Sequence, residues 1–165
     1  MTDLLDRPSL YERDFYAWTR EQARLLREAA AQRVNTPFDL ENLAEEIESL
    51  GRSDRRAVIS RLARIIEHAL KLEHSPAQQP RRGWKLSIRK QRVELRQAFA
   101  ESPSLRGELP ELAEQAYELG RLRAFEGMID EIEEDELPTA SPYQPEDLLD
   151  PDWFPAASED EQSDG

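Results

Sequence analysis

The chain has 165 residues, of which 38% are hydrophobic and 35% charged, a composition that suits one domain of helices with charged outer faces. It contains no cysteine, which excludes disulfides and thiolate sites and favours a reducing compartment. No apolar run approaches the roughly 18 residues that a membrane span needs, and residues 1–8 lack the features of a signal peptide. We therefore expect a cytoplasmic protein with no membrane partner.

The net charge of −13 is concentrated at the C-terminal end of the chain. Residues 1–129 contain all 22 Lys and Arg and 21 of the 35 Asp and Glu, so their charge is 22 − 21 = +1. Residues 130–165 contain the other 14 acids and no Lys or Arg. The acidity therefore belongs to the tail and says little about the partners of the body.

The first predicted helix begins at Ser9, which forms a capping-box pattern with Glu12, and ends before Asn35. Apolar residues recur along it at spacings of three, four or their sums, as they do on one face of a helix. We expect burial of that face, which consists of Tyr11, Phe15, Trp18, Leu25 and Ala29.

The second predicted helix begins at Asp39, a favourable N-cap, and Phe38 is placed to contact Leu43 in a hydrophobic staple. Gly51 lies within it and costs roughly 1 kcal/mol relative to alanine. We predict one continuous helix of about 50 Å that ends at Ser75-Pro76. Its apolar stripe consists of Leu40, Leu43, Ile47 and Leu50, followed by Val58, Leu62, Ile65, Ala69 and Leu72.

The third predicted helix covers about residues 82–101, and the fourth begins near Pro110, because proline fits the first turn of a helix. The apolar stripe of the third helix is Trp84, Ile88, Leu95 and Phe99, and that of the fourth is Leu112, Ala116, Leu119, Leu122, Phe125 and Ile129. Beyond residue 130 an acidic run and repeated prolines indicate disorder by composition, although apolar residues interrupt them.

These elements predict an all-α fold, specifically an antiparallel four-helix bundle with one long helix, because short connections favour antiparallel neighbours. We expect the bundle to cover residues 1–130. A Pro-rich, acidic extension over residues 131–155 is expected to pack on the bundle, and residues 156–165 are expected to form a free acidic end.

Several segments resemble a bacterial family catalogued as domain of unknown function twenty-nine, over about residues 8–155. The segments that carry the resemblance are Leu10 to Trp18, Asp39 to Gly51, His68-Ala69-Leu70-Lys71, Trp84 with Ile88 and Gln91-Arg92, Ser102 to Arg106, Leu137-Pro138, Ser141-Pro142-Tyr143 and Leu148-Leu149. The resemblance implies a helical, cytoplasmic, bacterial protein whose Pro-rich tail belongs to the domain. It implies no activity.

A candidate basic stripe recurs every three or four residues along the third helix and consists of Arg82, Lys85, Arg89, Arg92 and Arg96. Such a row could attract a nucleic-acid backbone. A structural interpretation is favoured, in which this stripe is a solvated face or pairs with a carboxylate row on the second helix, each exposed pair contributing about 0–1 kcal/mol. A surface for a protein partner is the next alternative, ahead of nucleic acid. The carboxylate row consists of Glu41, Glu45 and Glu48, which a divalent ion could also use only if further carboxylates faced them.

A second candidate face combines a histidine with three cations, namely His68, Lys71, Arg64 and Arg61. It could bind an anion or take part in acid–base chemistry, because histidine titrates near neutral pH. A structural role is favoured. His68 and His74 each follow a glutamate and lie six residues apart, a spacing that does not converge on one metal ion, so we predict no metal site.

The candidate tail anchors are Tyr143, Leu148, Leu149, Trp153 and Phe154. We favour their folding back onto the bundle, with docking to another protein as the alternative.

No phosphate-binding loop or catalytic triad is recognisable, so we predict no catalytic residue and no cofactor, and the interpretation leans against an enzyme. The leading hypothesis is a non-enzymatic protein-interaction module with an unidentified protein partner. The alternatives are nucleic-acid binding by the basic stripe with an autoinhibitory acidic tail, and an unrecognised metal or hydrolytic site. The oligomeric state is not predicted.

Overall fold

The computed structural model describes residues 9–156 of the chain. The expectations for residues 1–8, and for the acidic end beyond residue 156, lie outside these residues. Within residues 9–156 the fold is all-α, with seven α-helices, one short 3-10 helix and no strand. No helix in this range is long and apolar enough to cross a membrane.

The described residues divide into two compact units, 9–57 with 97–108 and 58–96 with 109–156. The long helix α3 (Leu40–His74) and the helix α4 (Arg81–Glu101) each contribute to both units. The four long helices expected from the sequence are present, since α2 (Phe15–Ala31) and α6 (Leu109–Gly127) complete the set. Their arrangement as a single four-helix bundle is not confirmed.

In the first unit the chain forms two helices where the sequence predicted one. Helix α1 (Leu10–Arg13) begins as expected, with the Glu12 carboxylate accepting a hydrogen bond from the Ser9 backbone N–H at 2.8 Å. The helix then breaks at Asp14, whose side chain accepts from the Ala17 N–H at 2.9 Å and so caps α2. The same carboxylate binds Ser104 in the short helix α5 (Pro103–Gly107).

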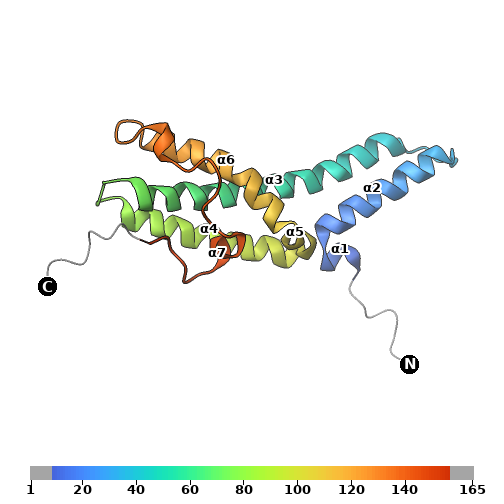
Figure 1. The fold of residues 1–165 in the computed structure, drawn as a ribbon. Coiled ribbons are helices and arrows are strands. Elements are labelled where there is room, and N and C mark those ends of the chain that lie inside the picture. The colour runs from blue at the N-terminus through green and yellow to red at the C-terminus, as the bar shows by residue number, and fades with distance from the viewer. Residues whose placement is uncertain (1–8, 157–165) are drawn as a thin grey trace, which may run out of the picture. The chain divides into compact units, whose positions relative to one another are not determined.

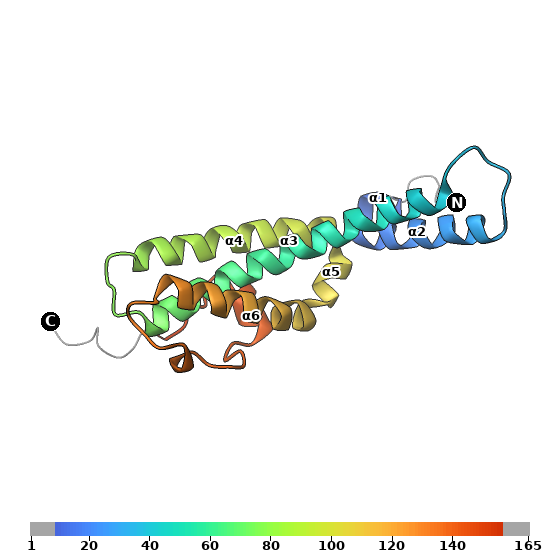
Figure 2. The same cartoon turned by 90° about the horizontal axis from the view of Figure 1, so that it is seen from above.

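Helix α2 and the first part of α3 form an antiparallel hairpin (Figures 1 and 2). Asp39 caps α3 as predicted, because its carboxylate accepts from the Asn42 N–H at 3.2 Å. Phe38 is exposed, so the predicted staple to Leu43 is not confirmed. Helix α3 continues through Gly51 as expected, and Gly51 lies close against α2: a Cβ there would lie 2.4 Å from Thr19 Oγ1.

The second unit holds the larger core, formed by α3 from residue 58, α4 to residue 96, and α6. Its fully buried large side chains are Leu62, Ile65, Ile66, Leu70, Ile88, Leu95, Leu109, Leu112, Met128, Leu137 and Leu148. Helices α3 and α6 touch at Gly120, where a Cβ would lie 2.8 Å from the Ala63 carbonyl oxygen and from Ile66.

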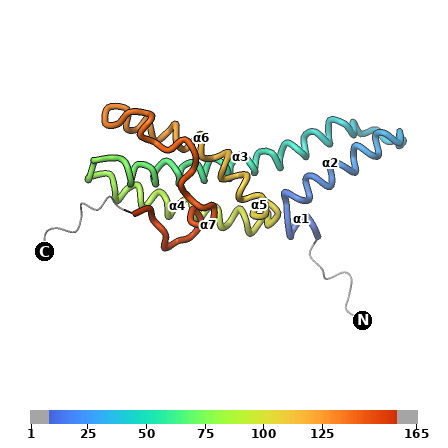
Figure 3. The backbone as a smooth tube through the Cα atoms, in the orientation of Figure 1, coloured from blue at the N-terminus to red at the C-terminus, as the bar shows by residue number. Residues whose placement is uncertain are grey.

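The C-terminal segment follows α6 and runs back over the second unit (Figure 3). It contains two short elements that the sequence analysis did not predict, the 3-10 helix η1 (Glu134–Glu136) and the helix α7 (Pro145–Leu149). The Tyr143 hydroxyl donates a hydrogen bond to the Glu73 carboxylate of α3, and Arg92 of α4 donates to the Leu148 carbonyl. The Pro-rich extension therefore packs on the helices.

Candidate functional site

The apolar stripes predicted for the hairpin are not its buried face. Leu25 of α2 is 42% exposed, and Leu43 and Leu50 of α3 are 41% and 51% exposed. Apart from Tyr16, the residues buried in the hairpin are small, and include Thr19, Ala23, Ala44 and Gly51. Small side chains allow close approach of the two backbones, and this approach decides which face is buried.

The exposed leucines lie on one side of the hairpin. Leu43 and Leu50 of α3 each come one position before a buried residue, and Trp18 of α2 comes one position before buried Thr19. Leu25 lies seven residues after Trp18, which is about two helical turns, so the two share one side of α2. In antiparallel helices, residues that precede the contact positions point to the same side of the pair. Tyr11 packs edge-on against Trp18, with ring centroids 4.9 Å apart. We call the surface of Tyr11, Trp18, Leu25, Leu43 and Leu50 the hairpin face.

Ion pairs occupy the opposite side of the hairpin, where residues follow the contact positions. Arg27 of α2 pairs with Glu48 at 2.6 Å and with Glu45 at 3.5 Å. Arg52 pairs with the same two carboxylates from within α3. The Arg27 guanidinium hydrogen-bonds Glu48 and so lowers the pKa of that carboxyl.

The carboxylate row predicted on the second helix is therefore explained by local pairing. Glu45 and Glu48 bind Arg27 and Arg52, so their partners differ from the basic stripe that the sequence suggested. Glu41 is exposed. Within residues 9–156 no three His, Asp or Glu side chains form a group that could hold a metal ion.

The basic stripe of α4 is not continuous, because Arg92 at its centre is only 3% exposed. Its Nε donates to the Leu148 carbonyl at 2.9 Å and its Nη2 donates to the Asp147 carbonyl at 3.2 Å. Its guanidinium also lies over the Trp153 and Phe154 rings, at 5.9 and 5.3 Å from their centroids. Burial lowers the pKa of Arg92. Arg92 is thus a structural residue rather than part of an open cationic surface.

The other four members of the stripe are exposed, namely Arg82, Lys85, Arg89 and Arg96. Arg89 lies over the Phe154 ring at 5.5 Å. An open cationic surface on α4 is therefore smaller than the sequence predicted.

The face around His68 already contains the carboxylates that balance its cations. Glu67 is buried, and its two oxygens pair with Lys71 at 2.7 Å and with Arg64 at 2.9 Å. Arg61 pairs with Glu94 of α4 at 3.1 Å. This neutralisation leaves less positive charge for an anion than the sequence indicated.

His68 itself is partly buried, next to the charged side chains of Glu67, Lys71 and Arg64. Burial lowers its pKa to about 4, against a smaller opposing effect of Glu67, so the imidazole is neutral at pH 7. Its Nδ1 is buried and has no hydrogen-bond partner among the described residues. A neutral, partly buried imidazole fits the structural role favoured by the sequence pattern.

The tail anchors differ in their burial. Tyr143 and Leu148 are buried, whereas Leu149, Trp153 and Phe154 are partly exposed. The Tyr143 and Trp153 rings pack edge-on, with centroids 5.4 Å apart. Burial, with the neighbouring Glu73, raises the pKa of Tyr143.

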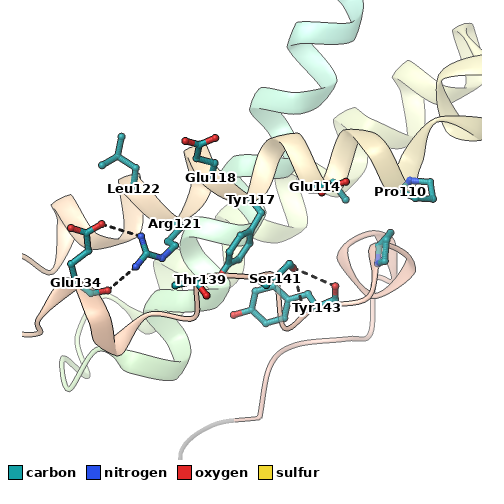
Figure 4. Close-up of a pocket in the computed structure, with 13 residues that line it drawn as sticks. Pro110, Glu114, Tyr117, Glu118, Arg121, Leu122, Glu134, Thr139, Ser141 and Tyr143 are labelled. Carbon is teal, nitrogen blue, oxygen red and sulfur yellow. Dashed lines mark hydrogen bonds and ion pairs between the residues drawn. The ribbon is translucent and has the colours of Figure 1, made fainter.

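A groove of about 670 Å³ lies on the second unit, between α6 and the C-terminal segment (Figure 4). Its α6 wall presents two exposed carboxylates, Glu114 and Glu118, one turn apart. Its opposite wall is the irregular, exposed stretch from Thr139 to Ser141. The apolar and aromatic lining is Pro110, Ala113, Tyr117, Leu122, Ala140, Tyr143 and Pro145. We call it the α6 groove.

Arg121 and Tyr117 hold the C-terminal segment in place beside this groove. The Tyr117 hydroxyl donates to the Pro138 carbonyl at 2.6 Å, and Arg121 Nε donates to the same oxygen at 3.0 Å. Arg121 also donates to the Glu134 carboxylate and to the Glu134 and Leu137 carbonyls. Its guanidinium is therefore fully engaged within the protein.

The α6 groove could not be predicted from the sequence, because residues more than 15 positions apart in the chain form it. The acidic wall of the groove could have been predicted from Glu114 and Glu118, since acids four residues apart share a helix face. The position of the opposite wall could not be predicted from the sequence, because the path of residues 137–145 depends on tertiary contacts with Tyr117 and Arg121.

The chain matches the family model described as domain of unknown function DUF29 over residues 10–154. It is also similar to an α-helical protein of unknown function from Rhodospirillum rubrum ATCC 11170, known from a crystal structure at 1.45 Å resolution. The two share 24% sequence identity and a TM-score of 0.72, over 88% of this chain and 92% of that chain, which shows a common fold. The chain has no match among curated proteins. Because the family model covers nearly all of its described residues, the chain belongs to the DUF29 family.

Proposed function

We propose that the chain is a cytoplasmic bacterial protein-interaction module, without catalytic activity, that binds a protein partner through the hairpin face. The observation that carries this proposal is the exposure of Leu25, Leu43 and Leu50 on one side of a hairpin whose other side is ion-paired. Exposed apolar patches with charged surroundings are typical of surfaces that bind proteins.

Physical chemistry favours a helical partner for this face. Two antiparallel helices with one apolar side make half of a helical bundle, and further helices complete such a bundle by covering that side. The leucines lie on regular helices, so the surface is preorganised and its binding costs little ordering of the backbone.

The test uses a photo-crosslinking amino acid at position 50, in the cell, with the same amino acid at position 86 as control. Leu86 of α4 is also exposed but lies outside the hairpin face. We expect a discrete protein adduct from position 50 and none from position 86. The double change Leu43→Ser and Leu50→Ser should abolish an adduct formed from position 25, with the circular dichroism spectrum unchanged.

Two results would overturn the proposal. One is equal or absent crosslinking at positions 50 and 86. The other is purified protein that stays monomeric and partner-free at micromolar concentration while it converts a small molecule.

A second candidate function is nucleic-acid binding by the exposed cations of α4. It is favoured by the exposure of Arg82, Lys85 and Arg89, for which the described residues provide no carboxylate partner. Binding of a DNA or RNA duplex should fall steeply with salt, because each phosphate contact releases counterions. If the acidic end competes for this surface, a chain that ends at residue 156 should bind more tightly than the full chain.

The end point at residue 156 matters for that experiment. Leu137, Tyr143 and Leu148 are buried, so a chain cut near residue 130 would lose part of its core. Undetectable or salt-insensitive binding by both chains would remove the nucleic-acid candidate.

A further inference from the structure

We infer that the α6 groove binds an extended segment of a partner protein in which an apolar side chain lies next to a Lys or Arg. The inference concerns a surface of the second unit and goes beyond the proposed function, which uses the hairpin face of the first. Either can fail without the other.

The lining of the groove provides the apolar half of the recognition. Ala113 and Tyr117 of α6 and Tyr143 of the C-terminal segment are nearly buried, and Pro110 and Pro145 also line the groove. The volume of about 670 Å³ lies within the range of sites that enclose a few side chains. Tyr117 and Tyr143 are fixed by hydrogen bonds to Pro138 and Glu73, so the lining is rigid.

The net negative charge of the groove favours binding of a positively charged side chain. Glu114, Glu118 and Glu134 line it together with one Arg121, so these side chains sum to −3 + 1 = −2 at neutral pH. Arg121 is already engaged by Glu134 and by backbone carbonyls, whereas Glu114 and Glu118 are exposed. A Lys or Arg of a partner would find both carboxylates on the same face of α6, one turn apart.

The same charges argue against the chain's own C-terminal residues as the occupant. Residues 157–165, which follow the groove wall in the sequence, contain four acids and no Lys or Arg, so Glu114 and Glu118 would repel them. A segment of opposite charge from another protein is the complementary occupant.

The shape of the groove favours an extended segment over a compact ligand. One wall is a helix, and the other is the exposed, non-helical stretch from Thr139 to Ser141 (Figure 4). Backbone groups on such a stretch are open to pairing with an extended peptide, and the pockets beside it receive alternate side chains.

Fluorescence anisotropy with capped, labelled five-residue peptides tests the inference. The probe peptide alternates leucine with arginine and lysine, and the control peptide has glutamate in place of both cations. We expect saturable binding of the basic peptide by the full chain at concentrations below about 1 mM, weakening with salt, and none of the acidic peptide. Arginine amide alone should not compete.

Three variants locate the binding. Glu114→Gln with Glu118→Gln should weaken binding roughly tenfold, since two charge pairs are lost. Ala140→Trp, a change at an exposed lining residue, should fill the groove and block binding. The matched control, Glu126→Gln with Asp130→Asn, removes two exposed acids at the same spacing outside the groove and should leave binding unchanged.

Several outcomes would overturn the inference. These are the absence of saturable binding, equal binding of the acidic peptide, full competition by arginine amide, or an affinity that the groove variants leave unchanged while their circular dichroism and thermal stability match the full chain.

Discussion

Asp14 and Ser104 lie 90 residues apart in the chain, and Asp14 binds Ser104 at both ends of its carboxylate: Oδ2 accepts from the Ser104 N–H and Oδ1 from the Ser104 hydroxyl, each at 2.8 Å. Oδ1 also accepts from the Ala17 N–H at 2.9 Å. One carboxylate therefore caps α2 and satisfies an N–H at the start of α5. A second hydrogen bond joins the same two segments, since the Ser102 hydroxyl accepts from the Tyr16 N–H at 3.1 Å.

Replacing Asp14 with alanine should destabilise the chain by about 2–3 kcal/mol, because three hydrogen bonds to one charged group are lost. Asp39→Ala is the matched control, since Asp39 caps α3 but is exposed, and within residues 9–156 its side chain binds Asn42 alone. It should cost about 1 kcal/mol. Urea denaturation of both variants measures the difference; equal costs would contradict the double role of Asp14.

Gly51→Ala should destabilise the first unit, although alanine is the better helix former. The new Cβ would meet Thr19 Oγ1 at 2.4 Å and Tyr16 at 3.3 Å, so the Thr19 side chain or α2 itself must move, at a cost of about 1–3 kcal/mol.

Gly83→Ala in α4 is the control for that change. A Cβ at Gly83 meets nothing within 4 Å, so this variant should be stabilised by up to about 1 kcal/mol. The combination of Thr19→Ala with Gly51→Ala should cost less than the sum of the single changes, because removing the hydroxyl relieves the clash. Additive free energies of unfolding would argue against the contact.

Arg92→Met should loosen the C-terminal segment. The two carbonyls that Arg92 binds, those of Leu148 and Asp147, lose their donor, and we expect a loss of about 2 kcal/mol in stability. Hydrogen exchange should accelerate over residues 143–156. Arg89→Met removes an exposed cation over Phe154 and should change stability by less than about 1 kcal/mol.

The stability of the chain should depend on the protonation of His68. Its pKa is about 4 in the folded state, below the ordinary value of 6.5, so the unfolded chain binds more protons between these pH values. The contribution of neutral His68 is therefore complete above about pH 6.5 and is lost as the pH falls towards 4. Its size is at most about 3 kcal/mol.

His68→Gln removes this titration, so the difference in unfolding free energy between the variant and the parent chain should change between pH 6.5 and 4. Comparing the two chains at each pH cancels the carboxylates that titrate in the same range. His74→Gln serves as the control. A difference that stays constant across the pH range would contradict the burial of a neutral His68.

The helices themselves could be predicted from local signals. Ser9 and Asp39 begin helices as their capping patterns indicated, Ser75-Pro76 follows the end of α3, and Pro103 begins α5 just after α4 ends. These signals are local because a cap or a proline acts on the backbone within one turn. The cap that Asp14 places on Ala17 is also local and was missed, whereas its bonds to Ser104 depend on the tertiary structure.

The sequence by itself determined where the four long helices lie, how the charge is divided and which segments resemble the family. It did not predict the break at Asp14 or the short elements α5, η1 and α7. In the second unit the predicted stripe of α3, from Val58 to Leu72, is buried as expected. In the hairpin, by contrast, the tertiary structure decided which side is buried. In the hairpin, Thr19, Ala44 and Gly51 form the contact although leucines lie one position away, because small residues let the backbones approach. On α4, Arg92 was predicted to be exposed but is buried, because its guanidinium donates hydrogen bonds to the carbonyls of Asp147 and Leu148. The periodicity of a sequence indicates that a helix has an apolar face, but the neighbouring elements determine whether that face is buried. In this structure the hairpin face is exposed.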